Sequence, residues 1–278
     1  MPEAPEIQAH AERMTSALEG KTLIKFELLS FASLKTVSPR PDDVVGSRLT
    51  AVERRGKCLI MKFDNDQAHL VHLMQGGRLR PDAKRSRKPR NGLARWVFND
   101  TAWLLTEAGT ERKAGVWAVD GDPLSQDPIG HLGLEVDQVD QVQLDAILRE
   151  HSKRLHGVLR DQRLIAGLGR MLANEICFEA RLSPFANTSK LTSEQRVDLL
   201  EAILEVTRRS TAHERTLEDI GKSIDRPSKV HNRQDKPCVD CDDVIRAVKY
   251  RKYTVYYCAS HQTSGKLLAD NTTSKFLK

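Results

Sequence analysis

The C-terminal part of the chain contains three cysteines and a histidine at the spacing of two metal-binding turns. Two residues separate Cys238 from Cys241, sixteen residues follow, and two residues separate Cys258 from His261. Paired ligands of this kind place three thiolates and an imidazole around one tetrahedral Zn²⁺, and four protein ligands leave no open position for a substrate. The sequence therefore predicts one structural zinc ion held by Cys238, Cys241, Cys258 and His261.

The N-terminus offers a different chemistry. Pro2 is small enough to allow normal removal of Met1, which would leave a secondary amine at the chain end. An α-amino group has a pKa near ~8, so a useful fraction of this amine is neutral at cellular pH. A neutral amine can attack C1′ of a deoxyribose and form an iminium, and the nearby Glu3 and Glu6 could move protons on the opening sugar. Taken alone, proline and glutamate near a helix start are more often ordinary N-terminal sequence.

Helices and strands must position these residues, and the pattern of apolar residues changes along the chain. A helix is predicted from Pro5 to a stop at Gly20. β-Rich sequence follows over 23–29, 48–63 and 69–74 and in two strands around a turn at Asn99 and Asp100, which favours an antiparallel sandwich or barrel. From about residue 140 the apolar spacing is helical, and residues 244–257 read as a hairpin between the two metal-binding turns.

Composition and charge indicate a globular, nucleic-acid-binding class. The 278 residues suggest two domains, and no segment approaches the ~20 apolar residues of a membrane span. No apolar signal stretch follows Met1, so we expect a cytoplasmic protein, associated with the bacterial nucleoid when bound to DNA. The net charge is +6. Basic residues are concentrated in residues 84–95 and the C-terminal third, while 114–148 contain no Lys or Arg. Such basic regions predict a DNA or RNA partner, although a solvated loop would also explain 84–95.

Four motifs in fixed order carry a family resemblance. MPEAPEI at the N-terminus, RRGKCL around Lys57, GLGRMLANEICFEARLSP and the terminal zinc finger occur in that sequence along the chain. Over nearly its whole length the chain resembles the formamidopyrimidine-DNA glycosylase/endonuclease VIII family. The resemblance implies an α+β fold with DNA held in the cleft between two halves. The implied segments are an N-terminal β-sandwich domain over 1–117, a linker over 118–147, a helix–two-turn–helix DNA-binding domain over 148–229, a zinc finger over 230–265 and a tail over 266–278.

The resemblance also implies roles for individual residues. Pro2 would be the nucleophile, Glu3 the acid/base that protonates the sugar ring, and Glu6 a further carboxylate near the site. Lys57 would contact phosphate and assist β-elimination. Gly169 and Arg170, in the helix–two-turn–helix motif, would hold a phosphate, with Arg170 standing where the family usually has Asn.

Several positions depart from the family pattern. Gln75 stands where a Met commonly fills the gap left by a flipped base. The companion loop carries Arg112 and Lys113 but has Ala114 in place of an aromatic wedge, so Gln75 and Lys113 would fill the gap by hydrogen bonding. Tyr253 occupies the position of a phosphate-gripping finger arginine, for which Arg251 or Lys252 could substitute after a small shift of the hairpin.

The resulting hypothesis is a monomeric base-excision-repair DNA glycosylase with AP lyase activity. Its partner would be damaged double-stranded DNA, with single-stranded or unusual structures left open. The stretch from Leu217 to Val230 is shorter than the loop that caps 8-oxoguanine in the formamidopyrimidine branch of the family. By this resemblance it favours an endonuclease VIII-like preference for oxidised pyrimidines or ring-opened purines. Two alternatives remain: a catalytically weakened DNA-binding member of the same fold, and a zinc-ribbon protein that binds RNA or the ribosome.

Overall fold

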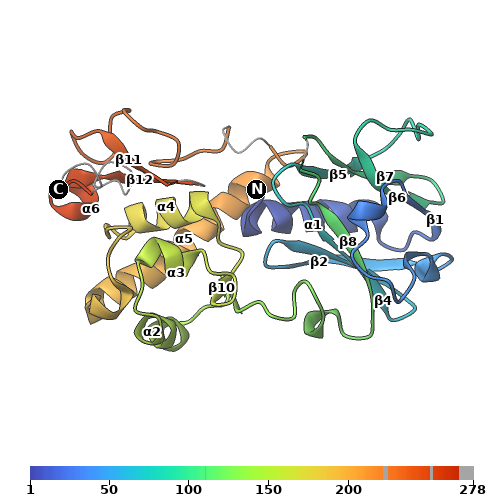
Figure 1. The fold of residues 1–278 in the computed structure, drawn as a ribbon, viewed down its shortest axis with the longest axis horizontal. Helices are drawn as coiled ribbons and strands as arrows, with labels where there is room; N and C mark the ends of the chain where they lie inside the picture. The colour runs from blue at the N-terminus through green and yellow to red at the C-terminus, as the bar shows by residue number, and fades with distance from the viewer. Residues whose placement is uncertain (110, 222–224, 251–252, 269–278) are drawn as a thin grey trace. The chain divides into compact units, whose positions relative to one another are not determined.

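The computed structural model describes residues 1–109, 111–221, 225–250 and 253–268, which form two compact units (Figure 1). Unit 1 comprises residues 1–132 and 213–220, and unit 2 comprises residues 133–212 and 221–278. The boundary at 132/133 falls within the connection that the sequence predicts over 118–147.

Helix α1 (Ala4–Leu18) opens unit 1, one residue before the predicted start. Pro5 lies in its first turn, where a missing backbone N–H costs no helical hydrogen bond. Ile7, Met14 and Leu18 are fully buried, as their spacing of three to four residues predicts. The helix ends before Gly20, whose φ of +76° favours glycine.

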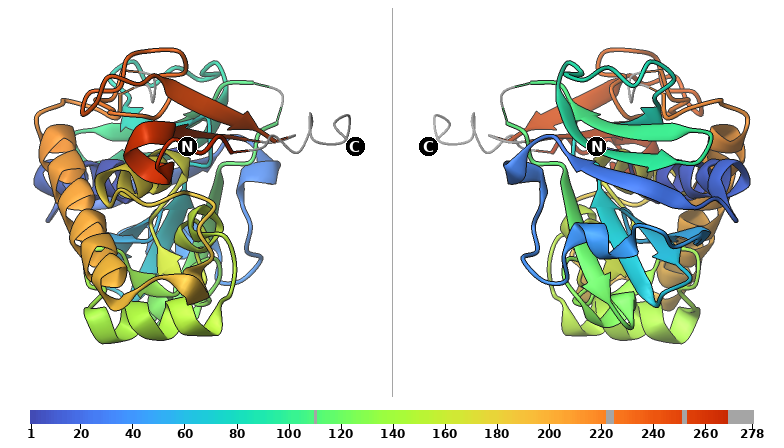
Figure 2. Two further views of the ribbon diagram at one scale, coloured as in Figure 1. Left: turned by 90° about the vertical axis from the view of Figure 1, so that its left-hand side faces the viewer. Right: turned by 90° about the vertical axis from the view of Figure 1, so that its right-hand side faces the viewer.

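Two four-stranded antiparallel sheets form the rest of unit 1, which confirms the predicted sandwich (Figure 2). The first sheet has the order β1 (Leu23–Leu28), β6 (Gly92–Phe98), β7 (Ala102–Glu107), β5 (Gly77–Pro81). The second has the order β2 (Leu49–Arg55), β3 (Cys58–Phe63), β4 (Gln67–His72), β8 (Gly115–Asp120). Short 3-10 turns η1 (Phe31–Ser33), η2 (Pro41–Val44) and η3 (Pro123–Ser125) lie between strands.

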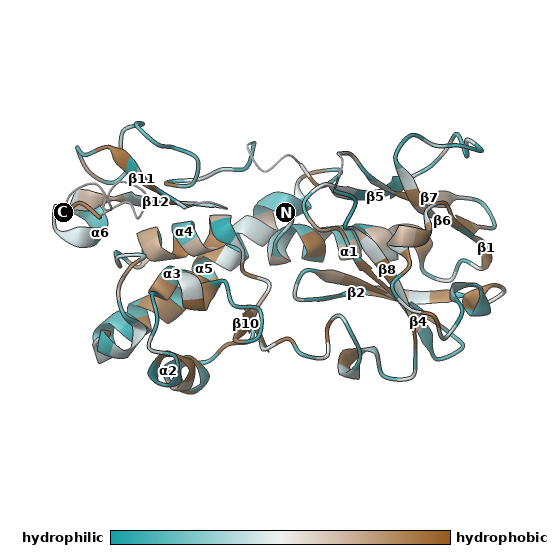
Figure 3. Ribbon diagram, viewed as in Figure 1, coloured by the Kyte–Doolittle hydropathy of each residue, from teal (hydrophilic) through white to brown (hydrophobic). Residues whose placement is uncertain are grey.

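One apolar core joins α1 to both sheets. Ile7 of α1, Trp96 of the first sheet and Met61 of the second belong to the same buried cluster. By contrast, the basic loop between β5 and β6 is exposed and hydrophilic (Figure 3). Arg95, at the end of that basic run, is buried and pairs with Glu27 and Asp82 at 2.5 and 2.7 Å.

A segment from the far end of the chain completes unit 1. Residues 213–220, which the sequence analysis assigns to the helical domain, pack here instead of with unit 2. Arg13 of α1 donates to the carbonyls of Glu214 and Leu217, each at 3.0 Å, and Ile220 enters the core cluster. These contacts connect residues two hundred positions apart, so no local pattern predicts them.

Unit 2 is mainly helical, as predicted. Thr192 and Gln195 form a capping box, each backbone N–H donating to the other's side chain at 3.1 and 3.2 Å. The helices are α2 (Gln141–Glu150), α3 (Leu155–Leu159), α4 (Arg170–Glu179), α5 (Ser193–Arg215, ending in unit 1) and α6 (Ala259–Thr263). The remaining elements are β9 (Leu134–Glu135) paired with β10 (Ile165–Ala166), the hairpin β11 (Ile245–Lys249) and β12 (Thr254–Cys258), and η4 (Thr188–Lys190).

Across the described residues, no helix combines the length and the apolarity needed to cross a bilayer.

Candidate functional site

The first turn of α1 gathers three of the predicted catalytic residues. Pro2 is buried, and only 4% of Glu3 and 1% of Glu6 are exposed. Glu3 is the N-cap residue, and its backbone N–H donates to Oε2 of Glu6 at 2.9 Å. Carboxylates are stabilised at a helix N-terminus by the positive end of the helix dipole. This part of the chain therefore places two buried carboxyl groups directly after Pro2.

Lys57 lies in the two-residue turn that joins β2 to β3. Gly56 has a φ of +56°, and Arg55 pairs with Cys58 across the turn. A positive φ at the first central residue suits glycine and a tight hairpin. The motif RRGKCL therefore folds so that Lys57 is presented at the tip of the hairpin.

Contacts along α1 show which end of that hairpin faces the N-terminus. The Thr15 hydroxyl, near the end of α1, donates to the Val52 carbonyl at 3.0 Å. Gln8, two turns earlier, accepts from Nε of Arg54 at 3.0 Å, nearer to the turn. The start of α1 thus approaches the turn end of the hairpin, which is the end that carries Lys57.

His72 is a neighbour of Lys57 that the sequence analysis did not single out. It pairs with Cys58 across β3 and β4, and its Nδ1 accepts from the Met74 N–H at 3.0 Å. Burial, together with the charge of Lys57, lowers the pKa of His72 to about 4. A neutral imidazole at physiological pH therefore lies beside the lysine, and its Nε2 carries the proton.

Gln75 is exposed in a tight turn that follows β4. Gly77 donates from its N–H to the Leu73 carbonyl at 2.8 Å, and a Cβ at position 77 would lie 2.3 Å from that oxygen. Only glycine fits there, so the turn holds a fixed shape with Gln75 outside the core.

Arg112 and Lys113 are exposed on the loop before β8, whereas Ala114 is buried. The Ala114 N–H donates to Oε2 of the buried Glu107 at 2.7 Å, and Lys113 pairs with Glu111 at 2.6 Å. The position expected to lack an aromatic wedge therefore faces the interior, and the two residues before it, Arg112 and Lys113, present polar side chains to the solvent.

In unit 2, Gly169 caps α4 and Arg170 opens it as an exposed residue. Further along the helix, Glu175 is buried and accepts three backbone N–H groups, from Lys229 at 2.8 Å, Val230 at 3.1 Å and His231 at 2.8 Å. Glu175 lies within GLGRMLANE, but the sequence predicts no role for it. It joins α4 to the segment that leads into the finger.

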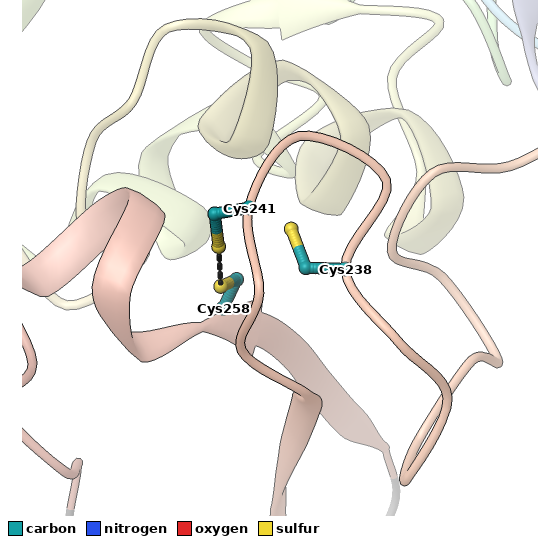
Figure 4. A group of neighbouring side chains, drawn as sticks. All are labelled: Cys238, Cys241 and Cys258. Carbon is teal, nitrogen blue, oxygen red and sulfur yellow. Dashed lines mark hydrogen bonds between the residues drawn. The ribbon is translucent and has the colours of Figure 1, made fainter.

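Three of the four predicted zinc ligands come together (Figure 4). The donor sulfurs of Cys238, Cys241 and Cys258 all lie within 4.8 Å of one another, and those of Cys241 and Cys258 are 3.4 Å apart. Thiolates that share a zinc ion at about 2.3 Å from each sulfur require comparable separations. The three sulfurs therefore fit a metal such as zinc.

His261 is not grouped with these sulfurs. Its Nε2 lies 3.1 Å from the Phe178 carbonyl, and its ring stacks on Phe178 with 4.4 Å between centroids. Its role as the fourth ligand therefore stays a prediction. The other two cysteines, Cys58 and Cys177, are buried, and burial raises the pKa of both thiols.

Tyr253 lies half-buried at the end of the hairpin loop. Arg251 and Lys252, which the sequence analysis named as substitutes for the finger arginine, lie outside the described residues.

Comparison with protein families matches two successive parts of the chain. Residues 1–114 match the formamidopyrimidine-DNA glycosylase N-terminal domain, and residues 131–219 match the formamidopyrimidine-DNA glycosylase H2TH domain. Together the two matches cover both the unit that carries Pro2 and Lys57 and the helices that carry Gly169 and Arg170.

Two similar curated proteins are named for the two activities of the predicted family. The chain is 27% identical over 267 residues to formamidopyrimidine-DNA glycosylase of Carboxydothermus hydrogenoformans, covering 93% of this chain and 98% of the relative. It is 29% identical over 273 residues to endonuclease 8 of Pectobacterium atrosepticum, covering 95% and 100%.

Solved structures agree with the fold. A formamidopyrimidine-DNA glycosylase from Thermus thermophilus matches with a TM-score of 0.82 at 23% identity, over 94% of this chain and 98% of that one. The Lactococcus lactis enzyme, non-covalently bound to DNA that contains an AP site, matches with a TM-score of 0.84 at 20% identity, over 94% and 99%.

Proposed function

The chain belongs to the formamidopyrimidine-DNA glycosylase/endonuclease VIII family, and from this premise we propose that it is a base-excision-repair DNA glycosylase with AP lyase activity. One observation carries the proposal. Pro2 precedes Glu3, the N-cap of α1, both Glu3 and Glu6 are buried, and the start of that helix faces the hairpin end that carries Lys57.

The chemistry requires the imino group of Pro2 to be free, because with Met1 attached its nitrogen is an amide without nucleophilic character. Once Met1 is removed, the nitrogen lone pair attacks C1′ of the damaged nucleotide, and the base leaves with the electrons of the glycosidic bond. The departing base takes up the proton that the amine nitrogen loses. Glu3 supplies a proton to the ring oxygen as the sugar opens, and an iminium forms at Pro2.

Strand cleavage follows from the same intermediate. Loss of a C2′ proton expels the 3′ phosphate by β-elimination, and water then hydrolyses the iminium and frees the amine. Lys57 would contact phosphate and assist this elimination, with the neutral His72 beside it. Zinc, held by Cys238, Cys241 and Cys258 with His261 as the proposed fourth ligand, would stabilise the finger and take no part in these steps.

The proposed partner is damaged double-stranded DNA. Gln75, Arg112 and Lys113 in unit 1 and Gly169 and Arg170 in unit 2 are the proposed contacts. The exposure of Gln75, Arg112, Lys113 and Arg170 supports four of them, and Gly169 is the N-cap of the helix that Arg170 opens. With Ala114 in place of an aromatic wedge, Gln75 and Lys113 would fill the gap by hydrogen bonding. The opposite base is left open, and so is single-stranded or unusual DNA as a further substrate.

For the lesion, we favour an endonuclease VIII-like preference for oxidised pyrimidines and ring-opened purines. The support is the short stretch from Leu217 to Val230, of which residues 222–224 lie outside the described part of the chain.

A panel of duplexes with single defined lesions tests the proposal. We expect the wild-type protein to excise oxidised pyrimidines and nick the strand, and Pro2→Gly to bind the same duplexes while excising far more slowly. Wild-type turnover by Pro2→Gly would refute the nucleophile assignment. Binding without excision by the wild-type protein would favour the catalytically weakened alternative, and tighter binding of plain RNA than of damaged duplex would favour the zinc-ribbon alternative.

A further inference from the structure

A stack of aromatic and cationic side chains occupies the open end of the finger hairpin in unit 2. The rings of Tyr250 and Tyr253 stack with 4.7 Å between centroids and 14° between planes. The Tyr250 N–H donates to the Tyr253 carbonyl at 2.8 Å, which closes the loop beneath the rings. The guanidinium carbon of Arg160, at the end of α3, lies 4.4 Å from the Tyr253 ring centroid.

A second cation approaches the same ring. The guanidinium carbon of Arg170, the first residue of α4, lies 6.0 Å from the Tyr253 ring centroid. Arg170 is exposed and forms no ion pair with any residue that the structure describes. Two guanidinium groups from different helices therefore converge on one aromatic face.

His156 lies beside this pair and is buried, with 3% of its surface exposed. Its ring is parallel to that of Tyr253, at 16° and 6.0 Å between centroids. Burial, with the neighbouring charges of Arg160 and Arg170, lowers the pKa of His156 to about 3, so the imidazole is neutral. Its Nε2 is buried and has no hydrogen-bond partner among the described residues. A buried polar atom of this kind costs stability unless a partner arrives.

The chemistry that fits this cluster is a phosphodiester. Arginine is planar and permanently charged, and its N–H groups match the oxygens of a phosphate in pairs. Stacking on the Tyr253 ring is a cation–π contact, which fixes the orientation of the guanidinium plane. The neutral His156, packed parallel to the Tyr253 ring, leaves the positive charge of the cluster to the two arginines.

We propose that Arg160, held on the ring of Tyr253, supplies the DNA phosphate contact that the family resemblance assigns to an arginine at position 253. Tyr253 stands at that position, and Arg160, at the end of α3, places a guanidinium over its ring. Arg170 and His156 complete the phosphate site, and Tyr253 acts as a positioning residue. The inference rests on the proposed DNA-repair function.

The test measures equilibrium binding of a duplex with a non-cleavable tetrahydrofuran abasic analogue, by fluorescence anisotropy over a range of salt concentrations. We expect Arg160→Met to weaken binding by about ten-fold, since a charged hydrogen-bonding group is lost. The slope of log K against log salt should fall by about one phosphate. Arg160→Lys should recover only part of the affinity, because an ammonium keeps the charge but cannot reproduce the planar stack.

A double variant that moves the arginine from position 160 to position 253 makes the test more specific. In the double variant Arg160→Met/Tyr253→Arg, the cation returns to the hairpin, and we expect both the affinity and the salt slope to recover. Arg208→Met provides the matched control, since Arg208 is an exposed arginine on α5 that pairs with Glu205 at 2.8 Å. It should leave binding unchanged. Thermal unfolding of each variant checks that the fold is intact.

The outcomes separate this inference from the proposed function. If Arg160→Met binds with the wild-type affinity and salt slope, or if the double variant binds no better than Arg160→Met, the assignment of Arg160 is overturned. If Arg160→Met does not fold, the double variant and Arg160→Lys decide in the same way. The proposed function is judged independently, by whether the wild-type protein forms a covalent adduct with abasic DNA on borohydride reduction.

Discussion

The start of α1 in unit 1 and the region around α4 and the finger in unit 2 assemble their functional residues in different ways. At the start of α1, Pro2, Glu3 and Glu6 come from one short run of sequence, and a single helix turn arranges them. In unit 2, the cluster on Tyr253 draws Arg160 from α3 and Arg170 from α4. Catalytic residues that lie in one contiguous segment are not easily supplied by another element. A contact assembled from separate elements can be supplied by a different element when one of its residues is replaced.

This difference predicts that mutations in the two regions have separate effects on chemistry and on DNA affinity. Changes near Pro2 should abolish chemistry and spare DNA affinity, and changes in unit 2 should weaken affinity or the finger and spare the intrinsic chemistry. Each experiment below challenges that division, beginning with the largest effect.

Glu3→Gln should slow base excision by about 10² to 10⁴-fold, the usual contribution of a positioned acid/base group. The amide keeps the size of the side chain but cannot supply the proton, so binding of the tetrahydrofuran duplex should change little. Single-turnover excision kinetics provide the measurement. Glu53→Gln, at an exposed glutamate of β2, is the matched control. Equal loss of binding and of excision in Glu3→Gln would break the proposed division.

Cys258→Ser should lower the zinc content to well below one ion per chain and weaken DNA binding strongly. The reason is that structural zinc contributes on the order of 10 kcal/mol to the folding of a small finger. Metal analysis and anisotropy measure the two effects. Cys177→Ser, at a buried cysteine outside the metal cluster, should keep its metal. An unchanged metal stoichiometry in Cys258→Ser would count against the ligand set.

Glu175→Leu should destabilise unit 2 by about 3 kcal/mol, because three backbone N–H groups lose their acceptor. Glu175→Gln keeps one acceptor oxygen and should cost less. Hydrogen exchange at the amides of residues 229–231 reports the effect locally. Equal protection of these amides in Glu175→Leu and the wild type would show that the carboxylate does not hold the finger segment.

Mild acid should affect unit 1 before unit 2. Burial lowers the pKa of His10, His69 and His72 in unit 1 to about 4, and that of His156 in unit 2 to about 3, against 6.5 ordinarily. Because these folded-state pKa values lie below the unfolded value, the unfolded chain binds more protons as the pH falls from 6.5 towards 4. Stability is therefore full above pH 6.5 and declines below it, by about 1 kcal/mol for each histidine at pH 5.5.

Hydrogen exchange at pH 7.5 and pH 5.5, corrected for intrinsic rates, should show the larger loss of protection in the sheets of unit 1. A larger loss in unit 2 would contradict the assignment of these buried histidines. Replacing His69 by Gln removes one titrating group and should reduce the loss in unit 1.

The same contrast explains what the sequence could predict. Short-range patterns gave the helix after Pro2, the strands of the sandwich, the hairpin between the metal-binding turns and the approach of three cysteines. Each depends on residue spacing within one or two elements. The role of His261 as the fourth ligand stays a prediction, since its imidazole has another partner in the Phe178 carbonyl, 83 residues away.

Arg160 and Glu175 were not predicted for a related reason. Within LRDQR, Arg160 has no feature that distinguishes it from a solvated arginine, and its importance arises only when Tyr253 packs beneath it. Glu175 on its helix gives no sign of the three N–H groups that it accepts from residues 229–231. Residues 213–220 pack with unit 1 through carbonyl acceptors and one isoleucine, which no sequence pattern marks.

The most direct test of the nucleophile is to locate the covalent bond. The wild-type protein is reduced with borohydride in the presence of an abasic-site duplex, digested, and its modified peptide sequenced by mass spectrometry. The account predicts a deoxyribose-derived adduct on the α-nitrogen of Pro2 in a chain that has lost Met1. An adduct on Lys57 or another lysine, or no adduct at all, would contradict it.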